Sequence, residues 1–189
     1  MRLYCTDIRG ANEEKALLPG RRPVAGSAFG VSLLSFAVKD FWGEMTLTRM
    51  DETGSGRPCF PEWPDRYFSI SHTKTHVLVA VSGFPVGADI ETRRPRSASL
   101  TSKLTDERER ADFEFFDLWV LRESLFKLTG KGDLRKMRFR RENGEIVPPV
   151  PGARCRLYGG VPGCAAAVSC FEGDFPEALI PVDVAEICS

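Results

Sequence analysis

The sequence predicts an α+β fold in which mostly antiparallel sheets are flanked by two long helices. Apolar residues recur at helical spacing in residues 29–42 and again in residues 113–129, which indicates the helices. Extended segments separated by turns lie between these stretches and after the second one, which indicates the sheets. A chain of 189 residues suffices for one domain or for two small lobes that share a core.

The first half of the chain begins with the helix over residues 29–42, for which Gly43 is the expected stop. A loop rich in glycine and proline follows over residues 54–64. Three strands come next, over residues 67–71, 77–81 and 86–91. Because a Ser-Gly-Phe-Pro turn separates the last two strands, we expect them to form a hairpin.

The second half begins with a long helix from about residue 106 to residue 129, ended by Gly130 and Gly132. The remaining strands are expected over residues 137–141, 154–158 and 165–171. Asn143-Gly144, directly after the first of these strands, is a strong signal for a tight hairpin turn.

Composition narrows the classes of function. Lys and Arg total 26 and so do Asp and Glu, so net charge indicates neither a nucleic-acid nor a membrane partner. Six cysteines are scattered without a Cys-x-x-Cys pair, and the first acidic residue comes too early for a signal peptide. We therefore expect free thiols, no zinc site and a cytoplasmic protein.

Basic residues nevertheless cluster between residues 93 and 110. The cluster comprises Arg93, Arg94, Arg96, Lys103, Arg108 and Arg110. A solvated surface of salt bridges explains such a cluster, and so does a surface that docks an acidic protein. The sequence leaves both interpretations open.

Two carboxylates share one face of the strand over residues 86–91. Side chains alternate along a strand, so Asp89 and Glu91 point the same way, and Gly87 before them permits a close approach of backbone or ligand. Such a pair suits Mg²⁺, which binds carboxylate, phosphate and water oxygens. Taken alone, these six residues also fit an ordinary strand with one face in solvent.

A third carboxylate interrupts an apolar helix face. Glu123 and Lys127 continue the line of Trp119 and Val120, while a leucine stripe covers another side of the helix. An exposed Glu–Lys pair four residues apart is common on helices. Because this pair lies among apolar residues, and a buried carboxylate needs a partner, a role in a site is favoured.

Ser71 and His72 end the first strand of the central group, so their side chains should point to opposite faces. This argues against a Ser–His nucleophile pair. His72 and His76 have helical spacing, but the intervening residues 73–75 predict a turn, so a two-histidine metal site is not expected. His72 has an alternative role as a phosphate donor together with Arg57.

Four segments, in order over residues 56–132, together resemble the Sfp-type 4′-phosphopantetheinyl transferase family. Gly-Arg-Pro at 56–58 resembles the family's Gly-Lys-Pro loop, and Phe-Ser-Ile-Ser-His-Thr at 68–73 resembles its Phe-Asn-x-Ser-His-Ser strand end. Gly-Ala-Asp-Ile-Glu at 87–91 matches the Gly-x-Asp-x-Glu signature. Trp-Val-Leu-Arg-Glu-Ser-Leu-Phe-Lys at 119–127, followed by Gly-Lys-Gly, matches the Trp-x-x-Lys-Glu helix.

The resemblance implies a fold of two similar α/β lobes with the active site in the cleft between them, here over residues 1–100 and 101–189. It implies Mg²⁺-dependent transfer of 4′-phosphopantetheine from coenzyme A to a serine hydroxyl of an acyl or peptidyl carrier protein, with release of 3′,5′-ADP. It also implies a monomer. Carriers of fatty-acid, polyketide and peptide synthesis all fit.

The resemblance further implies a role for each matching residue. Asp89, Glu91 and Glu123 would hold Mg²⁺, with Glu123 as general base, directly or through a metal-bound water. Lys127 would neutralise a phosphate oxygen or assist the leaving group.

Other matching residues would bind the coenzyme. Arg57, Ser71 and His72 would contact its 3′-phosphate end, with His72 also counted in the catalytic group. Arg22 corresponds to basic residues that clamp this phosphate in the family. Arg57 stands where the family has lysine, and so does Arg122, so a planar fork of donors replaces a point donor at each position.

Two other classes of function compete with the transferase. A non-catalytic module would bind coenzyme A or a carrier protein without transfer, but binding alone does not need three acids. A metal-dependent phosphohydrolase would also use grouped carboxylates and would release phosphopantetheine into solution. The order of the four motifs favours the transferase over both.

Overall fold

The computed structural model describes residues 1–12, 16, 28–44, 46–54 and 56–188. The strands are β1 (Arg2–Asp7), β2 (Asp51–Glu52), β3 (Pro58–Cys59), β4 (Tyr67–His72), β5 (His76–Ser82), β6 (Val86–Thr92), β7 (Arg140–Glu142), β8 (Glu145–Val147), β9 (Arg154–Tyr158), β10 (Cys164–Cys170) and β11 (Ile180–Pro181). The helices are α1 (Ala28–Trp42), α2 (Ala98–Leu104), α3 (Glu107–Asp112), α4 (Phe115–Thr129) and α5 (Val184–Ile187). In this described part of the chain, no helix has the length and apolar character needed to cross a membrane.

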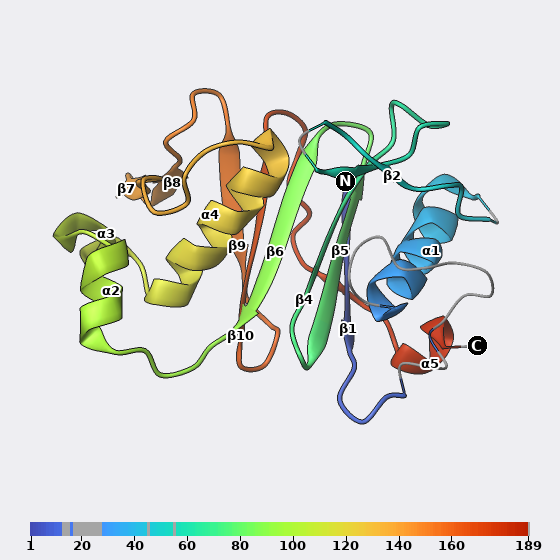
Figure 1. Cartoon of the computed structure of the whole chain (residues 1–189), viewed down its shortest axis with the longest axis horizontal. Coiled ribbons are helices and arrows are strands. Elements are labelled where there is room, and N and C mark those ends of the chain that lie inside the picture. Colours follow the sequence, from blue (N-terminus) through green and yellow to red (C-terminus); the bar gives the residue numbers. More distant parts are fainter. Residues whose placement is uncertain (13–15, 17–27, 45, 55, 189) are drawn as a thin grey trace.

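Two main sheets form the centre of the molecule (Figure 1). The first has the strand order β11-β1-β5-β4 and the second the order β6-β10-β9. Apart from the parallel contact between β1 and β11, the strands pair antiparallel. The predicted α+β class with mostly antiparallel sheets is therefore confirmed.

Each main sheet carries one long helix. Helix α1 packs on the first sheet around a core that includes Leu33 and Val79, and α4 packs on the second around a core that includes Leu121 and Ala167 (Figure 1). A third core lies on the opposite faces of both sheets, where Leu3 and Val168 are buried. This shared core joins the two sheets, because each contributes its second face to it.

Serine hydroxyls link the facing edges of the two sheets. The amide of Ala88 on β6 donates to Ser69 Oγ on β4 at 2.9 Å, and the amide of Ile90 donates to Ser71 Oγ at 3.2 Å. A hydroxyl can accept one hydrogen bond and donate another. Ser69 Oγ also donates to Ala88 O at 3.4 Å, so both of its bonds go to the β6 edge, whereas the hydroxyl of Ser71 remains a donor for the site described below.

The expected hairpin between the strands at 77–81 and 86–91 is wrong. Strand β5 pairs with both β4 and β1, whereas β6 pairs with β10 from the end of the chain. All seven residues of β5 are buried, so it is an inner strand with both edges occupied. The hairpin partner of β5 is β4, and β1, which sequence patterning did not reveal, takes its other edge.

The expected single helix from about residue 106 to 129 is also wrong. The chain is extended at Phe113 and Glu114, which separates α3 from α4. Phe113 is buried in the core beneath α4, and a capping box between Asp106 and Glu109 starts α3 separately. The break lets the chain turn so that a side chain of α3 reaches back to α4.

The predicted carboxyl ends of the two long helices and the predicted turn at Asn143-Gly144 are confirmed. Helix α1 ends at Gly43, whose amide donates to Lys39 O, and α4 ends at Gly130 with φ 67°. Asn143 and Gly144 have φ values of 52° and 83° and connect β7 to β8, as their sequence predicts. The strand expected over residues 137–141 begins only at Arg140.

Candidate active site

Gly87 lets α4 lie directly on β6. A Cβ atom at this position would lie 2.0 Å from Ser124 O and 2.5 Å from the Leu128 amide nitrogen, both backbone atoms of the helix. The sequence left open whether Gly87 permits a close approach of backbone or of ligand. The structure shows that the backbone of α4 approaches it. This approach brings the polar side chains of α4 over the strand that carries Asp89.

Asp89 is buried, and two donors fix its carboxylate. Ser71 Oγ donates to Asp89 Oδ1 at 2.7 Å, and Lys127 Nζ donates to the same oxygen at 2.8 Å. Lys127 also donates to the carbonyls of Ile70 on β4 and Ala88 on β6, at 3.3 and 3.2 Å. The ammonium group of Lys127 thus sits where both sheets meet α4.

Glu123 lies one helical turn before Lys127 and is partly buried. Burial raises the pKa of Glu123 above its ordinary value of 4.5, and the charge of Asp89 raises it further. Lys127 opposes the rise, and Glu91 adds to it. The three acids expected to act together therefore influence one another electrostatically, with Lys127 as the cation between them.

The donor chemistry of these acids fits a hard divalent cation. Carboxylate oxygens are the ligands that Mg²⁺ prefers, and the mutual repulsion felt by Glu123 is relieved by a positive charge. In the part of the chain that the structure describes, no three His, Cys, Asp or Glu side chains converge closely enough to hold a metal ion. Asp89 is engaged by Lys127 instead, and Glu91 lies 3.6 Å from Arg94.

Ser71 and His72 point to opposite sides of β4, as expected from strand geometry. Ser71 is buried against Asp89, and His72 is exposed. His76 is buried away from His72, with its Nδ1 2.9 Å from Thr75 Oγ1 and 3.6 Å from Cys164 Sγ. The turn predicted between the two histidines is present, since the Thr73 amide donates to His76 O.

Arg57 lies at the carboxyl end of α4. Its Nη1 donates to Leu128 O at 3.1 Å, and its guanidinium lies 6.0 Å from the centre of the Tyr67 ring. A pocket of about 250 Å³ opens beside Arg57 and is also lined by Arg66 and Tyr67. Arg66 is paired with Glu44 at 3.1 Å, whereas Arg57 contacts a carbonyl and an aromatic ring, so Arg57 suits an anionic ligand in this pocket. The predicted ligand Arg22 lies outside the described residues.

The arginine cluster lies beside the amino end of α4. Arg93 pairs with Glu114 and Asp117, and Arg96 lies 5.4 Å from the centre of the Phe116 ring. A hollow of about 460 Å³ lies here, lined by residues that include Arg93, Arg94, Arg96, Glu114, Phe115 and Phe116. Both sequence interpretations have support here, because Arg93 is salt-bridged while Arg96 covers an aromatic surface.

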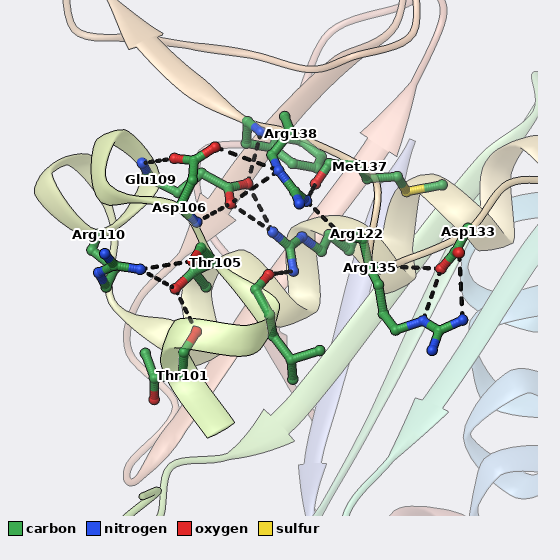
Figure 2. Close-up of polar contacts among 12 residues, drawn as sticks. Thr101, Thr105, Asp106, Glu109, Arg110, Arg122, Asp133, Arg135, Met137 and Arg138 are labelled. Carbon is green, nitrogen blue, oxygen red and sulfur yellow. Dashed lines mark hydrogen bonds and ion pairs between the residues drawn. The ribbon is translucent and has the colours of Figure 1, made fainter. Parts of the chain in front are cut away.

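Sequence reasoning missed one partnership. Arg122, noted only as a replacement for lysine, forms a buried ion pair with Glu109 on α3 (Figure 2). The signal that was available is the Asp106-x-x-Glu109 spacing, which marks the start of a helix. That spacing does not reveal that the same glutamate also reaches a second helix.

Comparison with known proteins identifies the family. No protein-family model matches the chain. It is 30% identical over 152 residues to 4′-phosphopantetheinyl transferase Sfp of Bacillus subtilis (strain 168), covering 70% of this chain and 67% of that one. It is 35% identical over 133 residues to 4′-phosphopantetheinyl transferase psf-1 of Bacillus pumilus, covering 65% and 55%. The matches thus span about half to two thirds of the length of these relatives. On this similarity, the chain belongs to the Sfp-type 4′-phosphopantetheinyl transferases, a family of transferase enzymes.

Proposed function

We propose that this chain transfers 4′-phosphopantetheine from coenzyme A to a serine hydroxyl of an acyl or peptidyl carrier protein and releases 3′,5′-ADP. The observation that carries the proposal is the junction of β4, β6 and α4. There a buried Asp89 is held by Lys127, next to a Glu123 whose pKa is raised by burial and by neighbouring carboxylates. Phosphoryl transfer depends mainly on positioning and charge stabilisation, which such a site supplies. The relatives' activity as 4′-phosphopantetheinyl transferases supports transfer of this group.

Asp89, Glu91 and Glu123 would hold Mg²⁺ in this proposal. When bound, the ion offsets the charge of the three carboxylates and polarises the oxygens of the coenzyme's pyrophosphate. The support is the donor set, which consists only of carboxylate oxygens, and the pKa of Glu123, which burial raises and the charges of Asp89 and Glu91 raise further.

The basic residues would bind the coenzyme. Lys127 would neutralise a phosphate oxygen, because its ammonium group lies in the site, where it binds the carboxylate of Asp89. Arg57, with the exposed His72, would contact the 3′-phosphate end, and the pocket beside Arg57 is the support for this placement. Ser71 and Arg22 are the other proposed coenzyme ligands, and the hydroxyl of Ser71 also orients Asp89.

Glu123 would act as the general base of the reaction, directly or through a water molecule. Its carboxylate takes the proton of the carrier serine, and the serine oxygen attacks the β-phosphorus of coenzyme A. The bond from that phosphorus to the leaving oxygen breaks, and 3′,5′-ADP departs. Lys127 would stabilise the charge that develops on the phosphate oxygens during this exchange.

The proposal includes the two-lobe organisation, divided at about residue 100, with the site between the lobes. Its support is that each main sheet carries its own 15-residue helix, α1 or α4. Strand β6 pairs within the second sheet and β11 within the first, so the chain crosses between the sheets more than once. We further propose a cytoplasmic monomer, and its six free cysteines suit a reducing compartment.

The arginine cluster would dock the carrier protein. The hollow lined by Arg93, Arg94, Arg96, Phe115 and Phe116 combines arginines with aromatic surface, and Glu114, which also lines it, pairs with Arg93. An acidic helix of a carrier would complement both features. The hollow lies near the amino end of α4, the helix that also carries Glu123.

Intact-mass analysis tests the function. Apo carrier proteins of several types are incubated with the chain, coenzyme A and Mg²⁺, with and without EDTA. We expect the carrier to gain the mass of one phosphopantetheine on its serine, and the gain to disappear with EDTA. Bound coenzyme A without any gain would indicate a binding module. Phosphopantetheine released into solution without an acceptor would indicate a hydrolase.

A further inference from the structure

Apolar packing alone does not fix the segment formed by α2 and α3, residues 98–112, which we call the α2–α3 arm. None of the residues of α2, all of which the structure describes, is buried. The buried residue of α3 is Glu109, an acid. Figure 1 shows both helices on the outer side of α4, away from the first sheet. Something other than a hydrophobic face must therefore hold the arm in one position.

The guanidinium of Arg122 on α4 forms hydrogen bonds with the arm at two points (Figure 2). Its Nη2 donates to both carboxylate oxygens of Glu109 at 2.8 Å, and its Nη1 donates to Leu104 O at 2.7 Å. Arg122 and Glu109 are each 1% exposed. One planar group thus binds the carboxyl end of α2 and the middle of α3 simultaneously.

Glu109 is held from other directions as well. Its carboxylate accepts hydrogen bonds from the Phe139 amide at 3.1 Å and from the Asp106 amide at 3.3 Å. Arg138 lies 3.4 Å from Asp106 and 3.9 Å from Glu109 (Figure 2). Glu109 therefore ties together α3, α4 and the segment that follows α4.

A buried ion pair of this kind determines position more than stability. Removing two charges from water has a large cost, which the attraction between them roughly offsets, so an apolar pair of similar volume is often equally stable. The three hydrogen bonds from Nη1 and Nη2 of Arg122, by contrast, require one arrangement of the arm, while Nε of Arg122 has no partner among the described residues. A lysine at position 122 would supply a single point of charge and could not make all three contacts in the same geometry.

The arm carries part of the proposed docking surface. Arg108 and Arg110 lie on α3, and Arg93, Arg94 and Arg96 precede α2. Arg122 is also the residue directly before Glu123. The pair thus connects the proposed docking surface to the helix that carries the proposed general base.

We propose that Arg122 and Glu109 are positioning residues that set the α2–α3 arm relative to α4, and thereby set the affinity for the carrier protein. The inference rests on the proposed transferase function with a carrier as acceptor. Neither side chain takes part in the chemistry. Loosening the pair should weaken carrier docking and leave coenzyme A binding unchanged.

The test compares Arg122→Lys and Glu109→Gln with the wild-type chain. Both variants keep side-chain size, so they avoid the void that an alanine would leave. We expect the KM for apo carrier to rise about tenfold, with kcat and the KM for coenzyme A unchanged. Arg135→Lys is the matched control, because Arg135 pairs with Asp133 at the surface, and it should behave as wild type. Backbone hydrogen exchange should accelerate in residues 98–112 of the two variants but not in α4.

Three results would overturn the inference: an unchanged carrier KM, a loss confined to kcat, or a raised KM for coenzyme A. If Arg122→Lys fails to fold, Arg122→Met combined with Glu109→Leu removes both charges at similar volume and should give the same KM change. If the wild-type chain transfers nothing, the proposed function fails instead. Hydrogen exchange then still decides the positional role, since an arm with unaltered exchange in Arg122→Lys would refute it.

Discussion

Helices α1 and α4 have the same length and the same structural task, but their buried surfaces differ in kind. Each has 15 residues and covers one main sheet. The buried residues of α1 are all uncharged, whereas α4 buries Arg122 and brings Glu123 and Lys127 into partly buried positions. Burying charge is costly, so charges retained in such places need partners and usually a purpose.

The partners are present on α4. Arg122 is paired with Glu109, and Lys127 is paired with Asp89. Glu123 is the exception, because burial and, after it, the like charges of Asp89 and Glu91 raise its pKa. The comparison therefore distinguishes α1, a structural helix, from α4, which packs on its sheet and also carries the residues proposed to take part in the chemistry.

The largest effect is expected when one charge is removed from each helix, which tests whether a charge on α4, unlike one on α1, is needed for transfer. Glu123→Gln should lower kcat for phosphopantetheine transfer by about 10²–10⁴-fold, because the proposed general base is lost. Lys39→Gln removes an exposed charge near the end of α1 and should leave transfer unchanged. Steady-state kinetics with an apo carrier provides the measurement, and circular dichroism confirms folding. Full activity in Glu123→Gln would refute the assigned role.

The close approach of α4 to β6 gives the next largest effect. Gly87→Ala places a methyl group against helix backbone that cannot move aside, so the free energy of unfolding should fall by about 3 kcal/mol. Gly83→Ala is the control, because a Cβ there meets nothing within 4 Å, and its change should stay within about 0.5 kcal/mol. Urea unfolding measures both. Equal stabilities of the two variants would contradict the described packing.

Charge reversal in the arginine cluster beside α4 tests whether this surface docks the carrier. Arg96→Glu and Arg108→Glu should each raise the KM for an acidic carrier, by up to about tenfold in low salt and less in high salt. Arg49→Glu, an exposed arginine on the α1 side that pairs with Asp51, should not change it. Kinetics at two ionic strengths makes the measurement. If the KM for the carrier is unchanged in both variants, the arginine cluster is a solvated surface and does not dock the carrier.

The smallest effect concerns stability and pH without added metal. The folded pKa of Glu123 lies above its ordinary value of 4.5, so its favourable contribution is fully present below pH 4.5 and is lost as pH rises through the folded pKa. Glu123→Gln should therefore have a slightly higher Tm than wild type at pH 7, and a smaller advantage at pH 4.

Added Mg²⁺ extends that measurement. It should raise the Tm of wild type more than that of Glu123→Gln, because one of the proposed ligands is missing from the variant. Thermal unfolding at both pH values, with EDTA or with Mg²⁺, gives all the required comparisons. A variant that is less stable than wild type at pH 7 in EDTA would show that the surroundings of Glu123 do not destabilise its ionised carboxylate.

Much of the fold could be predicted from local pattern. The helix over residues 29–42 and the turn at Asn143-Gly144 depend on periodicity and on backbone conformations that local sequence encodes. Strand pairing could not be predicted in the same way. Strand β6 pairs with β10, about 80 residues further along the chain, and nothing local to β6 marks that choice.

The same division holds for the site. Local sequence suffices to predict the types of residue, the shared face of Asp89 and Glu91, the helical line that carries Glu123 and Lys127, and the family resemblance, because each depends on short-range geometry or on ordered motifs. The pairing of Lys127 with Asp89 and of Arg122 with Glu109 depends on tertiary packing. These partners come from different strands and helices. The close packing permitted by Gly87 and the interruption between α3 and α4 at Phe113 bring them together.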